Sequence, residues 1–217
     1  MGKTLGPVLK QGDGTEVEKN GGLMKVSVTV VGITPLLMNA MTEAQLLAIR
    51  DKTKAAKNAQ RPALRDEAAQ KVHALNDGRP CIPITMLMSC LIGAGQFVRL
   101  DGRRQISTAS STVLPGLMNI ESLELPLVAG DGAAQWEVDI QQGRNPNGGE
   151  AVAVVRPRFD HWQFTVDLLV DQKEVAISKI RELFDVAGRR CGLGDFRPKR
   201  KGIFGQFKVN EWTLAEV

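Results

Sequence analysis

A basic, glycine-rich stretch at residues 188–209, GRRCGLGDFRPKRKGIFGQFKV, constrains the fold of this chain more than any other segment. Before it, apolar residues recur with a helical period, which predicts a helix over 177–187. Gly188 stands where this helix should end, because glycine enters a left-handed cap without strain. After the stretch, Phe207 and Val209 alternate with polar residues, which is typical of a half-buried strand. The predicted order is helix, glycine-rich loop, strand.

The charge of the chain is concentrated in this loop. Residues 188–208 hold seven Lys or Arg side chains and one acid, Asp195, a local net charge of +6. The whole chain carries +4, so the remainder sums to −2. Glycines let a backbone approach a ligand with its N–H groups free to donate, and neighbouring cations favour phosphate. Such local basicity predicts a polyanion site, with an ordinary solvated loop as the alternative.

The candidate nucleic-acid-binding residues lie in this loop and in a second basic turn. They are Arg189, Arg190, Gly192, Gly194, Phe196, Arg197, Lys199, Arg200, Lys201 and Gly202, joined by Arg103 and Arg104.

Composition limits the class of protein. The length of 217 residues suits one domain with insertions. Apolar runs fall far short of a membrane span, and no leader-like start is present, so we expect no membrane partner. The three cysteines, Cys81, Cys90 and Cys191, have no metal-like spacing and suit reduced thiols in the cytoplasm. We expect no metal or cofactor.

The remaining chain is read in order from its patterns. Residues 1–22 lack periodicity and predict a flexible N-terminal arm, followed by a single domain over 23–217. A strand over 25–32 ends at Thr34-Pro35. Two basic helices, over 42–58 and from Pro62, make a helical insertion at about 42–76. A very apolar helix over 84–98 should be buried.

Residues 101–160 differ in kind, with short strand-like pieces near 113–123, 135–141 and 151–158 separated by turns. They predict a hairpin-bearing, thumb-like insertion. The clearest strand follows over 161–170. Without the insertions, the order of elements fits an α+β fold with a βαββαβ ferredoxin-like core, which is also the RNA-recognition-motif fold.

Three of these segments resemble the RAMP superfamily (repeat-associated mysterious proteins) of CRISPR systems. They are the Thr-Pro-Leu-Leu step after the first strand, the segment from Ile82-Pro83 through Leu91, and the late helix with Gly192-Leu193-Gly194 and Gly202-Ile203-Phe204-Gly205 before the last strand. In its size and its mid-chain insertion, the chain looks most like the backbone subunits of this superfamily, which bind guide RNA. A divergent phage or mobile-element member fits the same residues.

This resemblance implies a non-catalytic protein that binds single-stranded nucleic acid and self-assembles along it as a homo-oligomer or filament. Guide RNA in a multi-subunit effector and single-stranded DNA in phage annealing both stay open, because phosphate contacts do not read the sugar. Some RAMPs are endoribonucleases, which is a further alternative. The only histidines, His73 and His161, lie outside the glycine-rich stretch. An acidic site at Asp131 or Asp139 has no supporting spacing.

Overall fold

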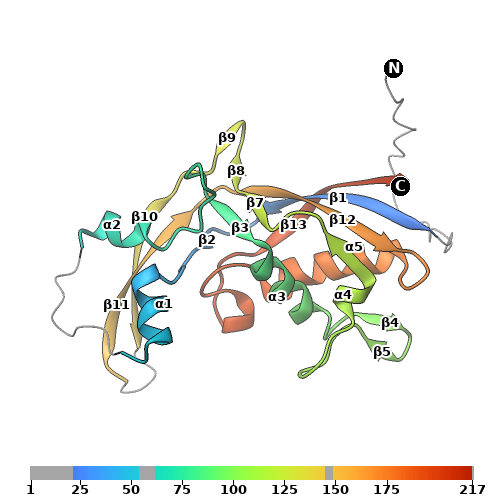
Figure 1. The fold of residues 1–217 in the computed structure, drawn as a ribbon, viewed down its shortest axis with the longest axis horizontal. Coiled ribbons are helices and arrows are strands. Elements are labelled where there is room, and N and C mark those ends of the chain that lie inside the picture. The colour runs from blue at the N-terminus through green and yellow to red at the C-terminus, as the bar shows by residue number, and fades with distance from the viewer. Residues whose placement is uncertain (1–21, 54–61, 145–148, 217) are drawn as a thin grey trace.

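The computed structural model describes residues 22–53, 62–144 and 149–216, so the predicted N-terminal arm lies almost wholly outside the described part. The chain forms a mixed α/β molecule whose strands pair antiparallel, which confirms the broad α+β class (Figure 1). The helices are α1 (Glu43–Arg50), α2 (Leu64–Ala69), α3 (Ile84–Ala94), α4 (Leu114–Leu117) and α5 (Ile177–Val186), with a π-helical turn η1 (Ala187–Cys191) and a 3-10 turn η2 (Pro198–Arg200). The strands are β1 (Leu23–Gly32), β2 (Leu36–Leu37), β3 (Cys81–Pro83), β4 (Arg99–Asp101), β5 (Arg104–Gln105), β6 (Met118–Ile120), β7 (Glu124–Pro126), β8 (Val128–Ala129), β9 (Gly132–Ala133), β10 (Glu137–Arg144), β11 (Ala151–Phe159), β12 (Gln163–Asp171) and β13 (Phe207–Glu216).

The main sheet has the order β13-β1-β12-β8-β9, and β6 also pairs with β12. Alternation explains its faces: Val26, Val28 and Val30 of β1 are fully buried, whereas the residues between them are partly exposed. Helices α3 and α5 cover the buried face, as Figure 1 shows. Helix α5 presents one apolar stripe that includes Ile180 and Leu183, which is why it lies flat on the sheet.

A second sheet, β10-β11-β2, lies at the other end of the molecule (Figure 1). Strands β10 and β11 form one long antiparallel hairpin, and β11 continues the pairing to β2 through Arg158 and Leu37. Helix α2 packs on this hairpin. The Lys71 ammonium that follows α2 donates to the Val155 carbonyl at 2.6 Å, and the Arg65 guanidinium lies 4.7 Å above the Trp136 ring.

Several predicted boundaries change in the structure. The helix predicted over 42–58 is α1, which ends at Arg50, and residues 54–61 lie outside the described part. The helix predicted over 84–98 ends at Ala94, because Gly95 packs against the Ser107 backbone and the chain turns there. The segment 113–123 contains α4 before the short strand β6. Segment 101–160 does not act as one projection, since β6 and β8 pair with β12 and only 137–159 forms the long hairpin.

Gly188 does not form the predicted left-handed cap. The chain continues through η1, and Gly192, with φ of 69°, supplies the left-handed residue instead. Gly188 is glycine because a Cβ there would lie 2.0 Å from the Phe207 carbonyl oxygen. The helix therefore runs one turn further than its apolar period indicates, and it ends against β13.

Candidate nucleic-acid interface

The glycine-rich loop, residues 192–206, is anchored to the segment that follows β1. The Gly205 N–H donates to the Pro35 carbonyl at 2.8 Å, and the Asp195 N–H donates to the Leu37 carbonyl at 2.8 Å. In return, the Ile33 N–H donates to the Gln206 carbonyl at 2.8 Å. The two sequence motifs that resemble the RAMP superfamily, the Thr-Pro-Leu-Leu step and the glycine-rich loop, are thus two sides of one packed unit.

The loop does not offer the free backbone cradle that its glycines suggested. Most of its N–H groups donate within the protein: Leu193 to Gly205, Gly202 to Arg197, Phe204 to Phe196, and Gly192 to Ala187. The glycines serve close packing instead. A Cβ at Gly194 would lie 2.2 Å from the Leu37 carbonyl oxygen, and φ there is +71°. The groups that this loop leaves free for an anion are therefore mainly its side chains.

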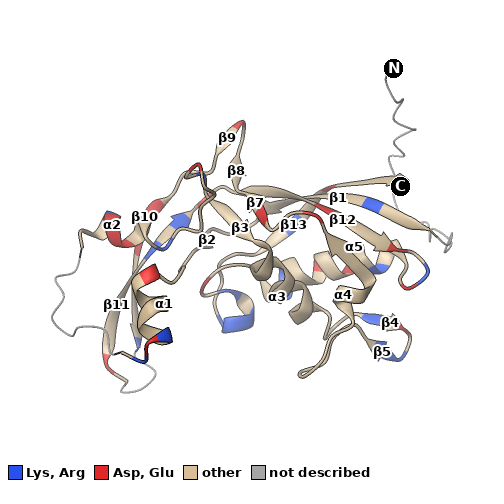
Figure 2. Ribbon diagram, in the orientation of Figure 1, with Lys and Arg blue, Asp and Glu red and all other residues tan. Residues whose placement is uncertain are grey.

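The loop cations differ in how strongly they are held. Arg200 and Lys201 are exposed at the tip, where Figure 2 shows a blue turn standing away from α3. Arg197 donates from Nη1 to the Gly194 carbonyl at 2.5 Å and is half-buried. Lys199 passes over Gly93 of α3, since a Cβ added there would lie 2.6 Å from its Nζ. The four are not equivalent, because Arg197 and Lys199 also support the loop.

The remaining loop cations lie at its base. The Arg189 Nε donates to the Asp185 carbonyl at 3.3 Å. The Arg190 guanidinium lies 4.9 Å above the ring of Phe97, which is 54% exposed. Among the described residues, no carboxylate lies within ion-pair distance of any of the seven cations of residues 188–208. Their charge is therefore available to an external anion.

The predicted residues Arg103 and Arg104 are not brought into the loop. They are exposed in the turn between β4 and β5, and Arg104 faces Asp101 at 3.9 Å. Figure 2 shows this turn and the loop as separate blue segments. Phe97, which precedes β4, lies under the Arg190 guanidinium. The second basic turn thus extends the charged surface instead of forming one site with the loop.

Two aromatic rings stand among the cations. Phe196 is 41% exposed, and its ring lies 6.1 Å from the ring of Phe204 with a tilt of 36°. Phe196 has φ of +48°, a left-handed conformation that L-residues with large side chains rarely adopt. Its carbonyl lies against Gly202, where a side chain would collide with it. An exposed ring beside cations is the arrangement on which a nucleobase can stack.

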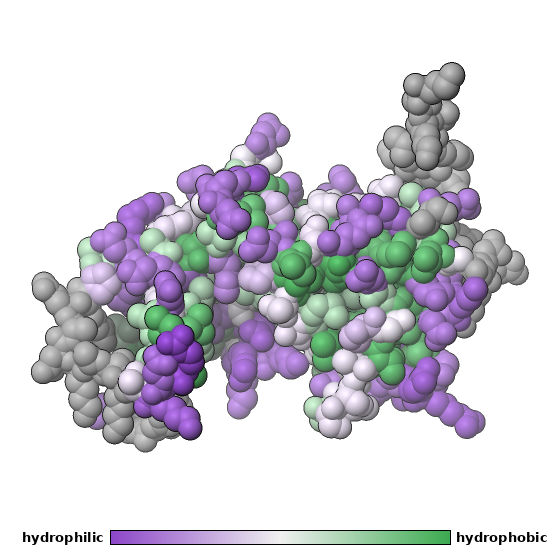
Figure 3. Space-filling view, in the orientation of Figure 1, coloured by the Kyte–Doolittle hydropathy of each residue, from purple (hydrophilic) through white to green (hydrophobic). Residues whose placement is uncertain are grey.

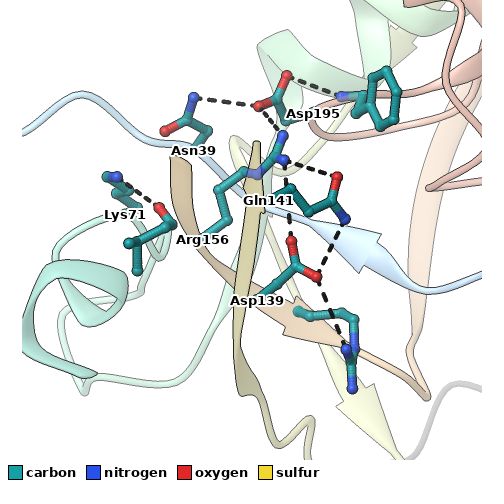
Figure 4. A network of polar contacts seen from close by, with 9 residues as sticks. Asn39, Lys71, Asp139, Gln141, Arg156 and Asp195 are labelled. Atoms are coloured by element: carbon teal, nitrogen blue, oxygen red, sulfur yellow. Dashed lines mark hydrogen bonds and ion pairs between the residues drawn. The ribbon is translucent and has the colours of Figure 1, made fainter. Parts of the chain in front are cut away.

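A buried ion pair beneath the loop has no signal in the local sequence pattern. Arg156 of β11 has a side chain that is only 7% exposed, and its Nη1 donates to the Asp195 carboxylate at 2.8 Å (Figure 4). Gln141 accepts from Arg156 at 3.2 Å, Asn39 donates to Asp195 at 3.3 Å, and the buried Asp139 carboxylate lies 4.0 Å from the Arg156 guanidinium. Arg156 of the second sheet therefore neutralises Asp195, which is the one acid of the loop.

A thiol pair lies below the loop base. A hydrogen bond from Cys90, together with the nearby cations Lys199 and Arg197, lowers the pKa of Cys191 to about 7. The same bond raises the pKa of Cys90, and the Cys90 thiol also contacts the Ala187 carbonyl at 3.6 Å. The cations contribute to the lowered pKa of Cys191 because a nearby positive charge favours the thiolate.

The structure offers little for the other chemistries considered. Burial lowers the pKa of His73, which lies after α2 and away from the loop, and His161 is exposed. Within the described ranges, no three His, Cys, Asp or Glu side chains are grouped to hold a metal ion. Within the same ranges, no helix has the length and apolar character needed to cross a bilayer.

Comparison with known proteins rests on structure. No protein-family model matches the chain, and no curated protein sequence does. A chain in the cryo-electron microscopy structure of the Type III-B Cmr-beta bound to cognate target RNA aligns with a TM-score of 0.57 at 12% identity. The alignment covers 91% of this chain and 62% of that one. The chain has the fold of that Cmr-beta protein. The crystal structure of Cmr6 from Pyrococcus furiosus aligns with a TM-score of 0.44 at 11% identity, covering 87% and 99% of the two chains.

The resemblance to CRISPR-associated RAMP proteins predicted from the sequence is thus confirmed at the level of fold. At 12% identity the chain is divergent, and it spans less than two thirds of the Cmr-beta chain. Its own activity therefore has to be argued from its own site.

Proposed function

We propose that this protein binds single-stranded RNA without cleaving it, through the side chains of the loop at residues 189–204. The observation that carries the proposal is the concentration of six cations, none with a carboxylate partner among the described residues, beside the exposed ring of Phe196. Side-chain cations give sequence-independent affinity for phosphates, and a ring adds stacking that tolerates any base. RNA is preferred over DNA because the Cmr-beta structure with the same fold holds target RNA.

We further propose that the main sheet is a ferredoxin-like βαββαβ core. Four of its strands run in the order β13-β1-β12-β6, with every neighbour antiparallel. Along the chain, α3 lies between β1 and β6, and α5 lies between β12 and β13. This is the arrangement expected of two interleaved βαβ halves. The glycine-rich loop then occupies the last crossover, between the second helix and the fourth strand.

Self-assembly belongs to the same proposal. Helix α1 buries none of its residues, and Leu46 and Ile49 are 53% and 62% exposed. Ile49, with Met41 and Ala48, lines a pocket of about 460 Å³. Figure 3 shows this apolar surface beside α1. An exposed apolar patch on a protein that assembles along a nucleic-acid strand suits contact with the next copy of the protein.

A cytoplasmic location of this protein remains a prediction.

The binding test removes charge only where it is free of structural contacts. Arg200→Gln with Lys201→Asn keeps the left-handed residue, because Asn tolerates the φ of 63° at position 201. Each lost phosphate contact should reduce the slope of log affinity against log salt by about 0.7, so the slope should flatten by about 1.4. Arg79→Gln with Lys173→Asn removes the same charge from exposed turns elsewhere and serves as the matched control.

The measurement is fluorescence anisotropy with oligouridylate and oligothymidylate of equal length across a salt series. The proposal expects the loop variant alone to lose affinity and slope, and expects tighter binding of the RNA. Equal loss in the control variant would show non-specific attraction. Tighter binding of the DNA would favour the annealing alternative. Shortening of the RNA during the assay would contradict the non-catalytic part of the proposal.

A further inference from the structure

Arg156 connects the second sheet to the proposed binding loop. It lies on β11, in the hairpin that pairs with β2, and its guanidinium reaches Asp195 at 2.8 Å across the space between the two. Figure 4 shows the side chain extended from the hairpin toward the loop, between Gln141 and Asp195. A buried guanidinium without a partner is strongly unfavourable, so this pairing fixes both groups.

Asp195, held by Arg156, in turn holds the backbone of Phe196. Its Oδ2 accepts from Arg156, whereas its Oδ1 accepts the Phe196 N–H at 2.9 Å. The Asp195 backbone is fixed as well, by its N–H bond to Leu37. Phe196 itself is held in the left-handed conformation, with φ of +48°. A large residue persists in such a conformation only when its surroundings over-determine it, and such residues gather at functional sites.

We propose that Arg156 is a positioning residue that, through Asp195, holds the Phe196 ring in place to stack on a nucleobase. This inference rests on the proposed function and adds a role to a residue outside the loop. The ring of Phe196 faces Phe204 on one side and remains 41% exposed, so it offers a surface for a base. The geometry couples base stacking to the position of the β10–β11 hairpin.

The same pair sets the local charge. Asp195 is the one acid among the seven cations, and its carboxylate is 36% exposed. Unpaired, it would repel an approaching phosphate. Because a loss of neutralisation would weaken binding of any backbone, whereas a loss of positioning would weaken only base stacking, the two roles can be separated by the ligand.

The experiment compares oligouridylate with an abasic oligoribose phosphate of the same length, which keeps the phosphates and lacks bases. Arg156→Gln should weaken oligouridylate binding at least about fivefold, the lower limit for one lost base stack. Any loss that the abasic ligand shares reports the uncovered charge of Asp195, so the preference for oligouridylate over the abasic ligand should fall by at least about fivefold. Arg158→Gln is the matched control for the shared contact with Asp139, because Arg158 lies on the same strand, also faces Asp139 at 3.9 Å, and pairs with Asp160 at 2.8 Å instead of Asp195.

A double-mutant cycle completes the test. If Arg156 acts through the ring, Arg156→Gln should cause no further loss of that preference in a Phe196→Leu protein. Additive losses of the preference, or equal losses on both ligands, would overturn the positioning role. Should Arg156→Gln fail to fold, as judged by circular dichroism, Asp195→Ala, which removes the acceptor of the Phe196 N–H, should lower the same preference.

The outcome also separates this inference from the proposed function. An unsubstituted protein that binds neither ligand would contradict the proposed function. One that binds the two ligands equally would retain phosphate binding and contradict only the stacking role of Phe196.

Discussion

At the scale of single residues, the glycines of the loop act mainly by absence of a side chain. Gly205 has φ of +69°, and a Cβ there would lie 1.9 Å from the Leu193 carbonyl oxygen. Gly202 likewise leaves room for the Phe196 carbonyl. The loop is therefore a packed element whose glycines position the cations, and a substitution that disturbs the packing should affect stability before it affects charge.

Gly205→Ala tests this packing. The strained φ and the backbone collision should together lower the free energy of unfolding by about 2 kcal/mol or more. Gly116→Ala is the control, because nothing lies within 4 Å of a Cβ there and the residue is helical. That change should be neutral or slightly stabilising. Urea unfolding followed by circular dichroism measures both, and an equal effect of the two would contradict the packing role.

At the scale of elements, α1 stands out because its stability is local. Thr42 and Gln45 form a capping box, with the Gln45 N–H donating to Thr42 Oγ1 at 3.3 Å. The helix buries no residue against the rest of the chain. A helix of this length without tertiary packing is marginal in water, so its cap should carry much of its stability.

Thr42→Ala should accordingly open α1 without unfolding the protein. Loss of an N-cap costs about 1 kcal/mol, so hydrogen exchange of residues 43–50 should accelerate about fivefold, while the melting temperature of the domain hardly changes. Thr53→Ala makes the same chemical change beyond the helix end and should leave exchange of these amides unaltered. Unchanged exchange in Thr42→Ala would mean that another contact stabilises α1.

At the scale of the whole molecule, two sheets lie at opposite ends and the loop joins them (Figure 1). The positive charge is concentrated at this junction, since residues 188–208 carry +6 in a chain of +4. The exposed apolar residues of α1 lie at the end of the second sheet. A molecule with charge at its middle and an apolar patch at one end suits repeated contact along a strand.

Self-assembly can be tested at the α1 patch. Leu46→Gln with Ile49→Gln should reduce the mass measured by light scattering, because both apolar side chains of α1 are more than half exposed and Ile49 borders the pocket. Leu123→Gln is the control, since Leu123 is 77% exposed in the connection between β6 and β7. A parent protein that is monomeric with and without RNA, or a variant of unchanged mass, would contradict assembly through α1.

The sequence by itself determined the parts of this protein that depend on local pattern. The alternation in β1 and β12, the apolar stripe of α5, the capping box of α1 and the charge of the loop are all visible in short windows, because side-chain periodicity follows backbone geometry. Only the tertiary structure decided where the loop N–H groups donate, which edge β6 and β8 join, and that Arg156 pairs with Asp195, 39 residues away. These features depend on pairings between distant segments, and no local period encodes which partner a buried polar group will meet.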